Sequence, residues 1–346
     1  MVEAIGLTPG RSTDLERPFG KDRVCGVVAD GRARGMIAQV RRGLRSTKTL
    51  ELRLDYLRDA RERSAFLSWL ARNQAPAVFL ATCRSRKGGG RFAGSRQAQL
   101  EILARAAAAG CRWCDLEIEV ARHYKPDELK KLLPGARVLV SYHDFQRTPK
   151  NLQKVANDLR ARGTNAVKVA AQCHSISDVV RVCGLANGRR DVVVVPMGDA
   201  GIPGRVLSLR AGSQMSYAAV EQATAPGQIS LADMQELYRA SRITSRTRVY
   251  GVIGNPIGHS LSPLLHNTAF RERQADAVFV PFLVRDLRDF LGAVEPFGIR
   301  GFAVTIPHKE TILRRLDDCD PLAARIGAVN TVVVRGGGRL YGYNTD

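Results

Sequence analysis

Short apolar runs rich in β-branched residues recur along the first part of the chain and constrain its fold more than any other feature. Most intervals between them show the apolar spacing of a helix, as over Ala60–Arg72, and a further helix is expected over Ser230–Arg239. Strands that are apolar on both faces and alternate with helices indicate a parallel sheet. Eight such units in roughly 220 residues predict a (β/α)8 (TIM) barrel, with a doubly wound open sheet as the alternative, because periodicity does not show closure. The expected strands are Val24–Val28, Thr49–Leu54, Ala77–Cys83, Trp113–Val120, Arg137–His143, Asn165–Ala170, Asp191–Met197 and Ser216–Val220.

A second series of strand and helix patterns follows a polar segment that lacks a hydrophobic period. This segment, Ser241–Arg248 (SRITSRTR), is interpreted as a linker. Apolar runs at Tyr250–Ile253, Ala277–Leu283 and Gly301–Ile306 then predict a smaller α/β domain. The expected organisation is a disordered lead-in over residues 1–20, the barrel over 21–240, the linker over 241–248 and the second domain over 249–346.

The formal net charge of +20 raises the question of nucleic-acid binding. Only 10 of the 53 basic residues are Lys, and the Arg residues are spread along the whole chain. Aromatic residues make up 6%, and no helix-turn-helix, zinc-finger or RNA-binding signature occurs. We therefore expect no nucleic-acid partner, although the positive charge suits anionic substrates.

The cysteines and the hydropathy of the chain bear on its compartment. Seven cysteines, an odd number scattered through apolar segments, favour reduced thiols and a cytoplasmic location. Cys111 and Cys114 form a lone CxxC without a second pair or a nearby His, so we expect no metal site. No apolar run reaches about eighteen residues, and the N-terminus lacks a secretory signal, so we expect no membrane partner. The sequence leaves the oligomeric state open, and a homodimer is compatible with it.

Polar residues stand at the carboxyl ends of the expected strands, where (β/α)8 barrels carry their chemistry. Lys168 lies in the apolar run NAVKVAA, and burial favours a neutral amine that can form a Schiff base with a ketone. His143 ends the preceding strand and can act as a general acid and base. Arg84 and Arg205, the latter in the loop expected after the seventh strand, can bind a carboxylate. The residues indicate a Schiff-base lyase or aldolase; alternatively, Lys168 extends to solvent or pairs with Glu117, and His143 only caps a strand.

Seven ordered motifs carry a resemblance to a known family. ELRLDYL, TCRS, DLE, SYHDF, NAVKVA, PMGDAGIPGR and TAPGQ follow one another over about residues 22–240. In this order and spacing they closely resemble type I 3-dehydroquinate dehydratase. The resemblance implies an imine between Lys168 and the C3 ketone of 3-dehydroquinate, removal of a C2 proton by His143, and syn elimination of water to 3-dehydroshikimate, with no cofactor. The residues that it assigns to the substrate's carboxylate and hydroxyls are Glu51, Arg53, Arg84, Arg205, Thr224 and Gln228.

One position departs from this family's pattern. Members often carry an acidic residue near His143, a few positions after the Arg that ends the third strand. Here that position falls within RKGGG, at Gly88. We expect the missing carboxylate to weaken the orientation of His143 and to lower the rate without abolishing activity.

The last part of the chain contains a second set of motifs. They are GVIGNPIGHSLSP from Gly251, GFAVTIPHKE from Gly301, GAVNTVVV from Gly327 and YNTD at Tyr343–Asp346. The glycines of the first motif lack the G-x-G-x-x-G spacing of a dinucleotide site. A strand-to-helix turn that presents serine hydroxyls to a small polar ligand explains that motif better. Together the motifs closely resemble the substrate-binding half of shikimate dehydrogenase.

The second resemblance implies a catalytic pair of Lys309 and Asp346. Lys309 would act as acid and base at the C3 oxygen of shikimate or 3-dehydroshikimate while a hydride passes between C3 and NADP. The residues that match the family's substrate-binding positions are Ser260, Ser262, Thr305 and Asn330. Ala303 departs from the usual Asn. Because the sequence stops before the domain that would hold NADP, we expect this half to bind its substrate without reducing it.

The two resemblances together predict a bifunctional fusion of two consecutive enzymes of the shikimate pathway. The product expected from the barrel, 3-dehydroshikimate, is the substrate expected for the second domain. Two other functions stay open from the sequence. One is a Schiff-base aldolase on the same barrel, and the other is a non-catalytic protein that binds shikimate-like ligands.

Overall fold

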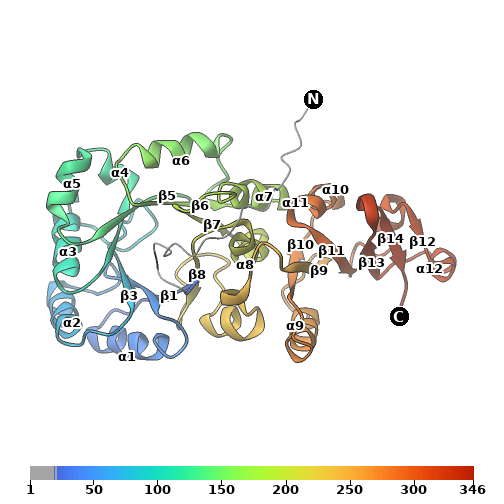
Figure 1. Ribbon diagram of the computed structural model, residues 1–346, viewed down its shortest axis with the longest axis horizontal. Coiled ribbons are helices and arrows are strands. Elements are labelled where there is room, and N and C mark those ends of the chain that lie inside the picture. Colours follow the sequence, from blue (N-terminus) through green and yellow to red (C-terminus); the bar gives the residue numbers. More distant parts are fainter. Residues whose placement is uncertain (1–18, 20–21) are drawn as a thin grey trace.

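The computed structural model describes Phe19 and residues 22–346, which form the two parts seen in Figure 1. The first part is an eight-stranded parallel sheet in which β1 pairs with both β2 and β8. Where β7 meets β8, Gln214 N donates to Val192 O at 3.0 Å, so the sheet is a nearly closed barrel, which confirms the predicted (β/α)8 fold. The strands are β1 (Val24–Val28), β2 (Thr49–Arg53), β3 (Val78–Thr82), β4 (Trp113–Glu117), β5 (Arg137–Asp144), β6 (Ala166–Gln172), β7 (Val192–Met197) and β8 (Ser216–Ala219).

Helices follow the strands and cover the outside of the barrel (Figure 1). Several begin where a polar side chain caps the first turn: Asp59, Ser95 and Ser175 each accept a hydrogen bond from a backbone N–H three residues later. The helices are α1 (Ala33–Gly43), α2 (Ala60–Arg72), α3 (Arg96–Ala108), α4 (Ile118–Ala121), α5 (Pro126–Leu132), α6 (Leu152–Arg160), α7 (Ile176–Gly184) and α8 (Ile202–Ala211).

Side chains along each barrel strand point alternately outward and inward, so they form an outer core against the helices and a separate cluster in the barrel interior. In β6, Val167 and Val169 belong to the core shared with the helices, whereas Ala170 belongs to the interior cluster. Lys168 therefore faces the interior as well, because successive side chains of a strand point to opposite faces. The same alternation in β2 turns Glu51 inward between residues of the outer core.

Aromatic rings fill the end of the barrel opposite the carboxyl ends of the strands. Phe19 stacks on Trp113 at the start of β4, with 4.1 Å between the ring centroids. The Phe19 side chain is buried, although it belongs to the lead-in that was expected to be disordered. The rest of residues 1–20 lies outside the described residues. A second pocket, lined by Phe19, Thr49 and Phe79 among others, lies at this end, but none of the residues predicted for a site line it.

The second part is built on a six-stranded mixed sheet in the order β10-β9-β11-β13-β14-β12. β9 lies between the parallel strands β10 and β11, while β13 runs antiparallel to β11 and β14. The strands are β9 (Arg248–Gly254), β10 (Ala277–Leu283), β11 (Ile299–Val304), β12 (Asp318–Cys319), β13 (Thr331–Val334) and β14 (Leu340–Tyr343). The helices are α9 (Ser262–Glu272), α10 (Leu287–Leu291), α11 (Val294–Phe297) and α12 (Pro321–Ile326).

The two parts meet at α7 and α8, which lie beside the second sheet in Figure 1. At the start of α7, the Asp289 carboxylate accepts hydrogen bonds from Ile176 N (2.6 Å) and Ser177 N (3.0 Å). At the end of α8, Arg210 Nε donates to Thr247 O at 3.0 Å. Specific polar contacts therefore hold the second domain against the barrel.

Three predicted elements differ from the structure. The strand expected over Trp113–Val120 ends at Glu117, because helix α4 begins at the next residue. The segment that contains Arg205 is the first turn of α8 and not a loop, since its proline suits the start of a helix. The helix expected over Ser230–Arg239 is reduced to a single π-helical turn, Asp233–Leu237.

Candidate active site

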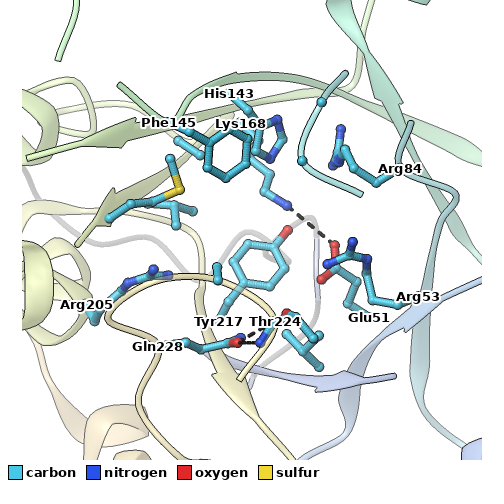
Figure 2. Close-up of a pocket in the computed structure, with 17 residues that line it drawn as sticks. Glu51, Arg53, Arg84, His143, Phe145, Lys168, Arg205, Tyr217, Thr224 and Gln228 are labelled. Atoms are coloured by element: carbon cyan, nitrogen blue, oxygen red, sulfur yellow. Dashed lines mark hydrogen bonds and ion pairs between the residues drawn. The ribbon is translucent and has the colours of Figure 1, made fainter. Parts of the chain in front are cut away.

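A cavity of about 490 Å³, counting its open mouth, lies at the carboxyl ends of the barrel strands. Figure 2 shows side chains from several strands and from the loop after β8 converging on it. All eight residues predicted for the barrel site line this cavity: Glu51, Arg53, Arg84, His143, Lys168, Arg205, Thr224 and Gln228. Residues that are far apart in the sequence thus share one site at the end where the fold places chemistry.

The Lys168 side chain is buried and ends between two carboxylates. Its Nζ lies 3.1 Å from Asp115 Oδ2 and 3.4 Å from Glu51 Oε1. The amine therefore lies in a charged environment, although its neighbours in the sequence are apolar. Glu117 is not the partner of Lys168; its carboxylate accepts hydrogen bonds from Ser85 and Gln99.

Asp115 connects Lys168 with a neighbouring arginine. Its carboxylate accepts hydrogen bonds from Arg84 Nη2 (2.7 Å) and from Ser141 Oγ (2.5 Å) as well as from Lys168. Burial alone would raise the pKa of Asp115, but the Arg84 and Lys168 charges lower it, and the net shift is downward. Asp115 is therefore a fixed negative charge at the centre of the site.

His143 is the last residue but one of β5 and lies beside Ala170 of β6. Its ring stacks on Phe145 with 6.0 Å between centroids and has no hydrogen-bond partner within the described part of the chain. Burial, followed by the Arg84 and Lys168 charges, holds the pKa of His143 well below its usual range. The imidazole is therefore neutral at neutral pH, as a proton acceptor must be.

Arg205 is 1% exposed and has no carboxylate partner among the described residues. Its Nη2 donates to Pro226 O at 3.0 Å, and its Nε has no acceptor. Burial lowers the pKa of Arg205 to about 10, so the guanidinium stays protonated at neutral pH. A buried cation without a counter-charge is suited to bind an anionic group.

The remaining predicted residues are partly engaged within the protein. The Arg53 guanidinium is held by Asp55 through two hydrogen bonds of 3.0 and 2.8 Å. Gln228 Oε1 accepts from Thr224 N (2.7 Å) and from Thr224 Oγ1 (3.2 Å), which orders the loop after β8. The Gln228 side-chain NH2 has no partner in the described residues and can donate to a ligand.

Gly88 lies in the loop after β3 and lines the cavity. A Cβ added at this position would overlap the Glu117 Oε1 atom. The Glu117 carboxylate therefore fills the space that a side chain at position 88 would need. Phe145 approaches the next residue, Gly89, in the same way and covers this edge of the cavity.

Three residues of the cavity network were not assigned from the sequence. Asp115 contacts Lys168, Phe145 stacks on His143, and Tyr217 of β8 lies beneath the Lys168 amine, 4.1 Å from Nζ to the ring centroid. Two signals were available. Asp115 stands two residues before Glu117 on the same face of β4, and Tyr217 is the only aromatic residue in the otherwise small-residue strand SYAA.

The residues predicted for the second site gather where β9 and β11 end, along one edge of the second sheet that runs across the strand ends. The loop after β9 carries Ser260, and Ser262 is the first residue of α9. Thr305 directly follows β11, which runs parallel to β9. Asn330 precedes β13 and accepts the hydrogen bond of Val304 N at the end of β11. Ala303, which departs from the family's pattern, pairs with Thr331 inside the sheet.

Lys309 and Asp346 form an ion pair of 2.5 Å at this edge. Their side chains are 39% and 65% exposed. Hydrogen bonds from Lys309 and then Asn330 lower the pKa of Asp346. Asn330 Oδ1 also accepts from Thr345 N at 3.1 Å, which fixes the approach of the terminal segment.

No group of three or more His, Cys, Asp or Glu side chains in the part of the chain that the structure describes could hold a metal ion. No helix within it is long and apolar enough to cross a membrane.

Comparison with known proteins places relatives along both domains. The Type I 3-dehydroquinase family matches residues 24–245, and the Shikimate dehydrogenase substrate binding domain matches residues 252–332. The bifunctional 3-dehydroquinate dehydratase/shikimate dehydrogenase of Arabidopsis thaliana, a chloroplastic protein, is 35% identical over 86% of this chain and 50% of its own length. A shikimate dehydrogenase (NADP(+)) of Bacillus cereus is 55% identical over 29% of this chain and 36% of its own. The chain thus spans half or less of the length of these relatives.

Solved structures show the same fold. The dehydroquinate dehydratase and shikimate dehydrogenase part of S. pombe AroM covers 94% of this chain and 65% of that one, with a TM-score of 0.50 and 22% identity. The 3-dehydroquinate dehydratase of Geobacillus kaustophilus covers 64% of this chain and 93% of that one, with a TM-score of 0.57 and 21% identity. Because the first family match spans the whole barrel and well over half of the sequence, the chain belongs to the type I 3-dehydroquinase family.

Proposed function

We propose that the barrel dehydrates 3-dehydroquinate to 3-dehydroshikimate through an imine on Lys168. The observation that carries this proposal is the pairing of a buried lysine with a buried, uncompensated Arg205 in one cavity. A ligand for this site needs a carbonyl for the amine and an anionic group for the guanidinium. 3-Dehydroquinate has both, and the names of the relatives support that choice.

The first step joins the substrate to the enzyme. The Lys168 amine, once deprotonated, adds to the C3 ketone, and the carbinolamine loses water to give the imine. Glu51 and Asp115, within 3.4 Å of Nζ, stabilise the positive charge on nitrogen before and after this step. The protonated imine withdraws electrons and acidifies the neighbouring C2 hydrogen.

His143 then moves the proton. The neutral imidazole removes the C2 proton and leaves an enamine, and the imidazolium returns that proton to the departing C1 hydroxyl, which leaves as water on the same face. The depressed pKa of His143 favours the neutral base that starts this sequence. Hydrolysis of the imine releases 3-dehydroshikimate and restores the Lys168 amine.

The remaining polar residues hold the substrate in this arrangement. Arg205 binds the carboxylate, with the side-chain NH2 of Gln228 as a further donor. Glu51, Arg53 and Arg84 face the hydroxyl groups. No cofactor takes part in this scheme.

The seven cysteines are all unpaired, which supports a reducing compartment such as the cytoplasm.

For the second domain we propose binding of a shikimate-type ligand at the sheet edge that carries Lys309 and Asp346. The glycines of β9 do not fit a dinucleotide. A Cβ at Gly251 would meet Phe282, and one at Gly254 would meet Thr305. These glycines therefore serve packing within the domain and not the close approach of a pyrophosphate.

Turnover of 3-dehydroquinate tests the barrel's function. The product contains a conjugated enone, so its formation can be followed by ultraviolet absorbance. We expect steady product formation by the 346-residue chain and none by Lys168→Ala, with the exposed Lys154→Ala as the matched control. Cleavage of a sugar phosphate without any dehydration would contradict the proposal and favour an aldolase.

A further inference from the structure

Tyr217 is a buried residue of the cavity whose polar group has no partner. The side chain is 3% exposed, and its hydroxyl makes no hydrogen bond within the described residues. Figure 2 shows the ring in the middle of the cavity, with the hydroxyl directed toward the Lys168 amine and Glu51. The position is therefore at the reacting groups and not at the periphery of the site.

A hydroxyl buried without a partner costs free energy, because it gives up its hydrogen bonds to water. Phenylalanine at this position would keep the ring packing and avoid that cost. The ring has a contact of its own, since the Lys168 amine lies 4.1 Å from its centroid, as in a cation–π pair. The free protein thus gives a reason for the ring but none for the hydroxyl.

The hydroxyl is a donor and not an anion. Burial, followed by the charge of Glu51, raises the pKa of Tyr217 well above its usual range. The phenol therefore keeps its proton at physiological pH, and a phenolic O–H can donate one hydrogen bond. The nearby carboxylates are already occupied: Glu51 Oε1 accepts from Thr82 and Lys168, and Asp115 accepts from Arg84, Ser141 and Lys168.

We propose that Tyr217 is a catalytic residue that donates a hydrogen bond to a substrate oxygen beside the carbon attacked by Lys168. This inference rests on the proposed dehydratase function. The candidate oxygens are the ketone oxygen, which becomes the carbinolamine hydroxyl, and the hydroxyl on the adjacent carbon. Either lies within reach of a donor directed toward both Nζ and Glu51.

Tyr217→Phe removes the hydroxyl and keeps the ring. We expect kcat/KM for 3-dehydroquinate to fall by about 3- to 10-fold, the range for one lost hydrogen bond. Tm should stay the same or rise, because no intramolecular hydrogen bond is lost. Tyr238→Phe is the matched control, since Tyr238 is also a largely buried tyrosine but does not line the cavity.

Borohydride reduction, which traps an imine as a stable secondary amine, separates the two proposals. If the imine of Tyr217→Phe is trapped more slowly at saturating substrate, the Tyr217 hydrogen bond goes to the ketone oxygen. If KM rises while the trapping rate is unchanged, the hydrogen bond goes to the adjacent hydroxyl. Wild-type kcat, KM and trapping rate in Tyr217→Phe would overturn this inference while leaving the dehydratase intact. Absence of any Lys168 adduct in the wild-type chain would instead overturn the proposed function.

Discussion

The two sites of this chain use the same kinds of charged side chain in opposite environments. In the barrel, Lys168 and Asp115 are buried in a network. In the second domain, Lys309 and Asp346 form a single pair that is largely open to solvent. Charges interact strongly where water is excluded and weakly where it screens them. The barrel site is therefore preorganised by its own residues, whereas the exposed pair depends on what its ligand supplies.

The largest effect should come from the centre of the buried site. Lys168→Ala removes the amine that forms the imine, so we expect dehydration to fall to the background rate. Absorbance at the enone band measures this, with Lys154→Ala as the control. Near-normal turnover by Lys168→Ala would remove the main difference between the two sites.

A smaller but still large effect is expected from His143→Ala. The imine should still form, because Lys168 and its carboxylates are untouched, but proton transfer should slow by about 10²- to 10⁴-fold. Single-turnover kinetics with mass detection of the trapped imine separates the two steps. Loss of trapping in this variant would show that His143 is needed earlier than we propose.

The pH profile tests the electrostatics of the same residue. Because burial and two neighbouring cations lower the pKa of His143, the base stays neutral as the pH falls below the ordinary histidine range. We expect kcat/KM to be level between about pH 6.5 and 8 and to be lost only at lower pH, as His143 becomes protonated. An acid limb centred at the ordinary value would contradict this arrangement.

Gly88→Ala should have a moderate effect. The added methyl group would displace the Glu117 carboxylate from Ser85 and Gln99, so we expect a loss of about 1–3 kcal/mol in the free energy of unfolding. Thermal and denaturant unfolding measure the change. Gly336→Ala, where an added Cβ meets no atom, is the control. Equal stability of both variants would show that Glu117 can leave its position without cost.

The smallest effect is expected at the exposed pair. Lys309→Met removes its charge, but water screens Asp346, so Tm should not change within error. Calorimetry with shikimate should show weakened binding in the same variant. A clear fall in Tm would mean that the pair stabilises the domain, and the contrast with the barrel would then be smaller than we describe.

Much of this arrangement could be predicted from the sequence. Strand periodicity gave the barrel, and the motif order placed Lys168, His143 and Arg205 near one another. The network between them could not be predicted, because it depends on register. Asp115 reaches Lys168 across β5, which lies between β4 and β6. Glu117, two residues later, turns to Ser85 instead.

Position 88 shows the same limit. The sequence shows a glycine where relatives often carry an acid, and we expected only a missing carboxylate. The structure shows that Glu117 fills this space, so the change affects packing as well as charge. The role of Tyr217 was also hidden, because an unpaired hydroxyl is visible only when its surroundings are known.

The most direct test of the central claim is to reduce the wild-type chain with borohydride during turnover of 3-dehydroquinate and to map the modified peptide by mass spectrometry. We predict one stable adduct, on Lys168, that forms only with substrate present and blocks further turnover. An active chain in which Lys168 stays unmodified, or in which another lysine carries the adduct, would contradict the account.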